Sequence, residues 1–193
     1  MSNDFNNNDG GMTTTQGPAS GGILDFVFSP LSWIFRARQT TINPDQETRL
    51  FLSGFDRKYS EQHPSFHGRS YIDAVRKAHR ESKFLIVYLH APLHEDTDKF
   101  CQQVLCRREV SDYCDRSAVT WAGQIWDTEA YALSQQLRVS TYPFVAVLMC
   151  RSEVEVEIVD RVQGKIEAGS LLNRFRNVMA SFETHINTVR QTQ

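Results

Sequence analysis

The sequence is poor in cysteine, carries no strong excess of charge and lacks long apolar runs. Four cysteines in 193 residues are too few for a disulfide scaffold, which favours reduced thiols in a cytosolic protein. A net charge of −2 argues against nucleic acid as a partner, since nucleic-acid-binding proteins usually carry a basic excess. No apolar run reaches the ~18–20 residues that one membrane-spanning helix needs. Forty per cent apolar residues nevertheless suffice for a core, which excludes global disorder.

The composition divides the chain into four segments. Residues 1–22 hold five of the ten glycines and few large apolar side chains. We expect a disordered tail there, because such a segment buries too little surface to offset its ordering entropy. Residues 23–38 contain a short apolar segment, residues 39–47 form a polar linker, and residues 48–190 have the pattern of a globular domain.

The apolar segment predicts a membrane anchor. Nine of the thirteen residues at 23–35 are large and apolar: Ile23, Leu24, Phe26, Val27, Phe28, Leu31, Trp33, Ile34 and Phe35. No lysine or arginine precedes Arg36, which argues against a secretory signal. We expect the segment to enter one lipid leaflet, with Trp33, Arg36 and Arg38 at the headgroup level. The alternative is that it packs on the domain or on a partner chain.

Apolar periodicity predicts the order of the elements in the globular part. The expected helices are 45–59, one opened by Ser70, 98–105 with a second short helix near 109–114, 127–137, and a long C-terminal helix from Leu171. The expected strands are 84–89, 118–122, 144–149 and 153–159. We expect Tyr131 to face inward, and Glu157 to lie on the charged outer face of an edge strand.

This order is the layout of a thioredoxin-like α/β fold, a central mixed sheet flanked by helices. Two details support it over an unrelated α/β domain. Pro143 directly precedes the third strand, where thioredoxin-like domains carry a cis-proline. The loop at 90–95 follows the first strand, where such domains place their active-site helix.

Dithiol chemistry on this fold needs two thiols separated by two residues at a helix start, where the helix dipole stabilises the thiolate. The sequence has no Cys-x-x-Cys motif, and residues 90–96 contain no sulfur. Cys101 and Cys106 are five residues apart, on different sides of a helix, and we expect small buried side chains rather than a displaced redox pair. We therefore predict a protein that is not an enzyme. A thiol enzyme on this scaffold is the alternative.

Two other groups of side chains are candidate sites. His90 and His94 flank the loop, but no spacing supplies three or four metal ligands, so we expect surface histidines, no metal and no cofactor. Arg107 and Arg108, with Arg116 further on, form a basic patch. Such a patch predicts a solvated face, or a site for an anionic lipid headgroup or carboxylate.

Several motifs together resemble the UAS domain of the Fas-associated factor family, in particular its membrane-associated members. They are 55–59 with His63-Pro64, 84–90, 96–101, Leu105-Cys106, Glu109-Val110 and 141–144. The resemblance spans about 45 to about 184, and the segment 23–35 lies where the family has its membrane hairpin.

The resemblance implies a thioredoxin-like domain without redox cysteines in an adaptor of ubiquitin-dependent endoplasmic-reticulum protein degradation. It implies a place on the cytoplasmic face of the endoplasmic reticulum membrane and on lipid droplets, with the cytosol as the alternative. The implied partners are the membrane or lipid-droplet monolayer, a long-chain unsaturated fatty acid that promotes self-association, and the valosin-containing AAA ATPase.

The sequence also differs from the family. It shows no recognisable ubiquitin-associated domain before Ile23 and no UBX domain, the part that docks the ATPase, towards Gln193. The resemblance therefore does not extend to ubiquitin binding or to direct ATPase docking by this chain. A truncated form, a fragment or a divergent paralogue would each show this pattern, and a competitor of the full-length adaptor is a further alternative function.

Overall fold

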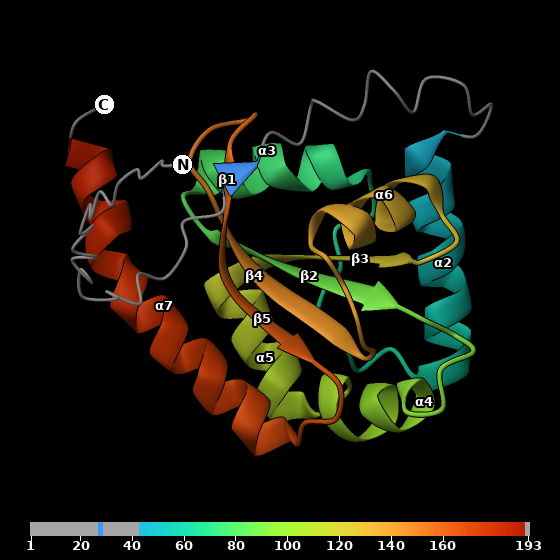
Figure 1. Ribbon diagram of the computed structural model, residues 1–193. Helices are drawn as coiled ribbons and strands as arrows, with labels where there is room; N and C mark the ends of the chain where they lie inside the picture. The colour runs from blue at the N-terminus through green and yellow to red at the C-terminus, as the bar shows by residue number, and fades with distance from the viewer. Residues whose placement is uncertain (1–26, 29–42, 192–193) are drawn as a thin grey trace, which may run out of the picture.

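The computed structural model describes residues 27–28 and 43–191 (Figure 1). The predicted tail at 1–22 and most of the predicted anchor and linker fall outside the described residues. Of the nine anchor residues, only Val27 and Phe28 are described, and they form the short strand β1 (Val27–Phe28). At these two residues the segment pairs with the central sheet, which corresponds to the alternative of packing on the domain. Membrane insertion of its other residues stays a prediction.

A five-stranded sheet forms the centre of the domain, in the order β1-β5-β4-β2-β3. Strand β2 (Phe84–His90) is parallel to β3 (Ala118–Gln124) and antiparallel to β4 (Phe144–Cys150). Strand β5 (Val156–Gln163) pairs antiparallel with β4 and, on its other side, with β1. This mixed sheet, with the expected succession of elements, confirms the predicted thioredoxin-like fold.

Helices cover both faces of the sheet (Figure 1). One face packs against α2 (Pro44–Tyr59), α4 (Thr97–Phe100), the π-helix Cys101–Leu105, α5 (Arg108–Ser117) and α7 (Ala168–Gln191). The other face packs against α3 (Tyr71–Glu81) and α6 (Thr128–Gln136). Among the described residues, no helix is both long and apolar enough to span a bilayer.

The sequence of β2 explains why both layers form. Its seven residues are all buried, and alternate side chains point to opposite faces of a strand. Phe84, Ile86 and Tyr88 join the core under α2 and α7. Leu85, Val87 and Leu89 join the core under α3 and α6. A strand that is apolar on both faces requires a helix layer on each side.

The prediction for the last strand is wrong in its start and in the exposure of Glu157. Strand β5 begins at Val156, because residues 151–155 form a loop in which the Arg151 N–H donates to Glu155 O at 2.9 Å. Glu157 is buried, and the Arg151 guanidinium stabilises its carboxylate through a hydrogen bond of 2.8 Å. The backbone of Glu157 also pairs with Val27 of β1, so β5 is not a free edge there.

Two details of the predicted helices also differ. Tyr131 is exposed, whereas Glu129, Ala130, Leu133 and Ser134 are the buried residues of α6. An exposed tyrosine keeps its hydroxyl in water, while the small and aliphatic neighbours pack on the sheet. The predicted helix at 98–105 begins one residue earlier and continues as a π-helix from Cys101.

Candidate binding groove beside the cis-proline

The loop between β2 and α4 is closed by its own hydrogen bonds. Thr97 Oγ1 donates to Ala91 O at 2.7 Å, and the His94 N–H donates to the same carbonyl at 3.0 Å. The Thr97 N–H in turn donates to His94 O at 3.1 Å. The loop is therefore a compact turn, at the position where a redox enzyme of this fold would carry its thiols.

The Tyr142–Pro143 peptide bond is cis, as predicted. Pro143 lies at the wall of a groove of about 980 Å³ between the α4 region and the start of α7. The Pro143 carbonyl accepts a hydrogen bond of 2.9 Å from Gly164, whose φ of +78° is a conformation that glycine adopts readily. This turn brings the wall at 165–170 up against the proline.

The groove combines an apolar surface with charges of both signs. Its apolar lining comes from Phe100, Val104, Pro143, Ile166 and Ala168. Its charged lining comes from Lys99, Arg107, Lys165, Asp96, Glu109 and Glu167. Lys165 Nζ lies 3.2 Å from Asp96 Oδ1, an ion pair that joins the two walls. A ligand with an apolar chain and an anionic head fits this lining.

The predicted basic patch is only partly brought together. Arg107 lines the groove, and Arg108 is exposed next to it, with Nε 3.7 Å from Asp112 Oδ2. Arg116 is exposed in the last turn of α5, eight residues and about 12 Å along the helix axis from Arg108. Only Arg107 therefore belongs to the groove.

His90 is buried, which corrects the prediction of a surface histidine. The rings of Phe51, Phe55 and Tyr59 pack around it, with centroid distances of 5.4 to 5.9 Å. Tyr88 Oη lies 2.9 Å from His90 Nδ1. Burial, with a smaller contribution from nearby Lys58, lowers the pKa of His90 to about 4, so the imidazole is neutral at pH 7.

His94 lies on the loop and is half-buried, so its position is closer to the prediction. Its Nδ1 accepts a hydrogen bond of 3.3 Å from the Asp96 N–H, and its ring lies 6.2 Å from that of Tyr142. Within residues 27–28 and 43–191, no group of three or more histidine, cysteine or acidic side chains is placed to hold a metal ion.

The four thiols are unsuited to nucleophilic chemistry at neutral pH. Cys101 is fully buried, as predicted, and its Sγ lies 3.2 Å from Tyr88 Oη. Burial raises the pKa of Cys101, Cys114 and Cys150 to about 12, and that of the half-buried Cys106 to about 11. A reactive cysteine needs the opposite shift, toward a stable thiolate.

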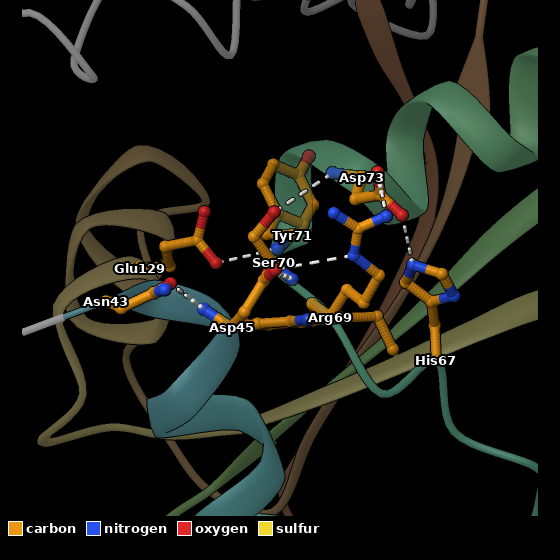
Figure 2. Close-up of polar contacts among 9 residues, drawn as sticks. Asn43, Asp45, His67, Arg69, Ser70, Tyr71, Asp73 and Glu129 are labelled. Atoms are coloured by element: carbon orange, nitrogen blue, oxygen red, sulfur yellow. Dashed lines mark hydrogen bonds and ion pairs between the residues drawn. The ribbon is translucent and has the colours of Figure 1, made fainter.

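A carboxylate cluster that the sequence did not reveal joins the N-terminal ends of α2, α3 and α6 (Figure 2). Glu129 Oε2 accepts a hydrogen bond of 2.6 Å from the Tyr71 N–H, in the first turn of α3. Asp45 Oδ1 accepts one of 2.7 Å from the Ser70 N–H, and Arg69 Nε lies 3.3 Å from Asp45 Oδ2. The two carboxyl groups thus satisfy backbone donors that a helix start leaves unpaired.

Burial makes Glu129 of this cluster, and Asp127 close to it in sequence, titratable near neutral pH. Glu129 is only 6% exposed, and burial raises its pKa to about 7 although the Tyr71 and Ile72 N–H groups lower it. Burial and the nearby charge of Glu47 raise the pKa of Asp127 to about 6. Glu47 itself accepts hydrogen bonds of 3.0 Å from the N–H and the hydroxyl of Thr128. The first turn of α2 is thereby tied to the first turn of α6.

Comparison with known proteins agrees with these features. Residues 51–137, which include the buried His90, the thiol-free loop and the π-helix, match the family model described as Fas-associated factor 1. Rat FAS-associated factor 2 is 33% identical over 174 residues, which cover 86% of this chain and 50% of the rat protein. Over most of its length the domain is therefore similar to Fas-associated factor proteins.

A plant protein and a solved thioredoxin structure are also similar to this chain. Plant UBX domain-containing protein 10 of Arabidopsis thaliana is 29% identical over 185 residues, 89% of this chain and 38% of that protein. The chain thus spans half or less of these Fas-associated factor and UBX relatives. A thioredoxin from Thermus thermophilus superposes with a TM-score of 0.51 at 22% identity, over 56% of this chain and 82% of the thioredoxin, which shows the shared fold.

Proposed function

We propose that the domain is a non-enzymatic binding module of a membrane-associated adaptor. One observation carries the proposal: the loop that would bear redox thiols is a sulfur-free turn, and the nearest cysteine, Cys101, is buried with its pKa raised to about 12. Similarity to Fas-associated factor and UBX-domain proteins supports an adaptor-type role. A redox scaffold without an activated thiol retains its groove as the feature available for binding.

The ligand that we propose for the groove is a long-chain unsaturated fatty acid. The apolar side chains Phe100, Val104 and Ile166 would contact the acyl chain, and Arg107 or Lys165 would pair with the carboxylate. Binding would compete with the existing ion pair between Lys165 and Asp96, and so would loosen the contact between the two walls. Self-association of the loaded domain would follow from surface exposed in this way.

The cellular setting that we propose rests on the family resemblance. Residues 23–35 would attach the chain to the cytoplasmic face of the endoplasmic reticulum or to a lipid-droplet monolayer. There it would act in ubiquitin-dependent degradation of membrane proteins, in the pathway of the valosin-containing AAA ATPase.

Fatty-acid binding tests the proposed function directly. Titration of the full chain with oleate, followed by calorimetry, should show one binding site that Arg107→Glu weakens by about tenfold, since a charge-assisted contact contributes ~1.5 kcal/mol. Arg116→Glu makes the same charge change on α5 outside the groove and should leave the affinity unchanged. Equal affinity of both variants, or no binding of oleate, would refute this assignment of the groove.

A further inference from the structure

Large apolar side chains are exposed at one edge of the domain. Among the described residues, five are strongly exposed: Leu50 at 64%, Leu93 at 85%, Trp126 at 60%, Tyr131 at 59% and Val154 at 42%. The first four come from α2, α6 and the two loops that follow β2 and β3. We call Leu50, Leu93, Trp126 and Tyr131 the edge patch.

Hydrogen bonds and ring contacts hold these elements together. The Ile125 N–H donates to His90 O at 3.0 Å, which joins the loop after β3 to the end of β2. The Phe51 ring packs 5.4 Å from the His90 ring, which places α2 at the same end.

The edge patch follows from these contacts. The bonds from Thr128 to Glu47 join the starts of α6 and α2. Trp126 precedes Thr128 by two residues and Tyr131 follows it by three, and Leu50 lies one turn beyond Glu47. Leu93 follows the end of β2 by three residues. The four side chains therefore surround one junction.

The position of this junction relative to the predicted anchor points to its partner. Helix α2 begins at Pro44, and eight residues separate it from the apolar segment 23–35. Eight residues span at most about 29 Å when fully extended. Val27 and Phe28 pair with β5, so the part of the segment left to enter lipid on this side is 29–35. If residues 29–35 lie in a lipid surface, the junction is tethered close to that surface. Tryptophan and tyrosine are the side chains enriched at the boundary between lipid and water.

Acidic side chains near the junction favour a zwitterionic lipid surface over an anionic one. Asp45 and Glu129 lie at the starts of α2 and α6 (Figure 2). Glu47 and Asp127 add two more carboxyl groups at the same helix starts. Arg69, which contacts Asp45, and the exposed Arg49 offset only part of this acidity. An anionic membrane would repel such a group of carboxylates, whereas a zwitterionic surface would not.

We propose that the edge patch docks the domain onto a zwitterionic lipid surface, with Trp126 and Tyr131 at headgroup depth. The inference rests on the proposed membrane attachment through residues 23–35. It adds a second contact, which would orient the domain on the membrane and leave the groove at the end of the sheet near α4 free for its ligand.

Tryptophan fluorescence tests the proposal in the full chain. Trp33→Phe removes the anchor tryptophan, and Trp121, only 1% exposed, supplies a constant background. On vesicles of phosphatidylcholine with brominated acyl chains, Trp126 emission should be quenched. The double variant Trp33→Phe/Trp126→Phe should show no quenching. Tyr131→Ser should reduce flotation with the vesicles about fivefold, whereas Val154→Ser, an exposed apolar site outside the edge patch, should not.

The outcomes separate this proposal from the proposed function. A chain that floats with unquenched Trp126 overturns the edge patch and leaves the anchor standing. A chain that does not float overturns both. If Phe26→Ser/Phe28→Ser/Trp33→Ser leaves quenching intact, the edge patch binds lipid by itself and the anchor is wrong. Stronger binding to phosphatidylserine vesicles would overturn the choice of surface. A blue shift of Trp126 with protein concentration, without vesicles, would assign the edge patch to a second copy.

Discussion

Replacing Glu129 by glutamine should change how the stability of the domain depends on pH. Glu129 lies between α6 and the first turn of α3, where its carboxyl group accepts the Tyr71 N–H at 2.6 Å. A glutamine side chain has nearly the same shape and keeps a carbonyl oxygen for this bond, but it carries no charge at any pH. The comparison therefore isolates the ionisation of one buried group.

The size of the effect follows from the pKa of Glu129. Burial raises this pKa from 4.5 to about 7 in the fold, and the nearby Asp45 and Glu47 charges add to the increase. At 1.36 kcal/mol for each tenfold change in proton affinity, the difference corresponds to roughly 3 kcal/mol. The folded protein binds the proton more tightly than the unfolded chain does. The stabilisation is therefore complete below pH 4.5 and is lost as the pH rises through 7.

Urea unfolding followed by circular dichroism at pH 5, 6, 7 and 8 measures this difference. At pH 8 the Glu129→Gln variant should be more stable than the wild type, by up to roughly 3 kcal/mol. At pH 5 the difference should shrink to about 1 kcal/mol or less, because that pH lies only just above the unfolded pKa of 4.5. Titrating groups that do not interact with Glu129 cancel in the comparison, whereas Asp45 and Glu47 contribute through their coupling to it. Stability curves that run parallel from pH 5 to 8 would refute the assignment of a raised pKa to Glu129.

Thiol reactivity and a pair of glycine substitutions test other parts of the structure. In the native protein at pH 8, a disulfide reagent should modify Cys106 first, and slowly. Cys106→Ser should remove that first phase. Modification of any cysteine within seconds would contradict the raised pKa values. Gly123→Ala should lower the free energy of unfolding by ~1–3 kcal/mol, because the added Cβ would lie 2.6 Å from Trp121 Cη2. Gly54→Ala lies in α2, where an added Cβ meets no atom within 4 Å, and it should raise the free energy of unfolding by ~0.5–1 kcal/mol. If thermal unfolding showed a change of the same sign for the two glycine variants, it would contradict this packing.

The sequence was sufficient to predict the layered fold because its strongest patterns are local. The residues of β2 and β4 are apolar without interruption, a pattern typical of strands covered on both faces. Ser70 and Asp73 mark the start of α3, and the Asp73 N–H indeed donates to Ser70 Oγ at 3.3 Å. Pro143 could be assigned because its place before β4 is typical of the fold.

The errors of prediction have non-local causes. The alternation of apolar and charged residues predicted that Glu157 faces solvent. In the structure, Arg151 from the loop after β4 pairs with the Glu157 carboxylate, and β1 pairs with the Glu157 backbone. His90 follows an apolar strand and looks like the first polar residue of a loop. Phe51 and Phe55, almost 40 residues earlier, cover it. Periodicity within one element carries no information on which distant side chains close over its end.

The groove and the carboxylate cluster are built from residues far apart in sequence, so periodicity within one element could not predict them. The walls of the groove come from residues 96–109 and 165–170, and Pro143 lies between them in sequence. The carboxylate cluster joins Asp45, Tyr71 and Glu129, which belong to three helices. Composition reveals that acidic residues are present at the helix starts. Only the packing of those starts against one another makes Glu129 buried and titratable.

The position of Cys101 explains why its thiol lies outside the groove. A thiol at the mouth of the groove would need exposure and unpaired backbone N–H groups to favour its thiolate. Here the N–H groups of His94 and Thr97 donate to Ala91 O and His94 O, and the first cysteine lies four residues after the start of α4. There the π-helix directs Cys101 into the core beside Tyr88, where burial stabilises the neutral thiol. The cis-proline, the Gly164 turn and the Lys165–Asp96 pair depend on none of these groups, so the groove forms independently of the thiol.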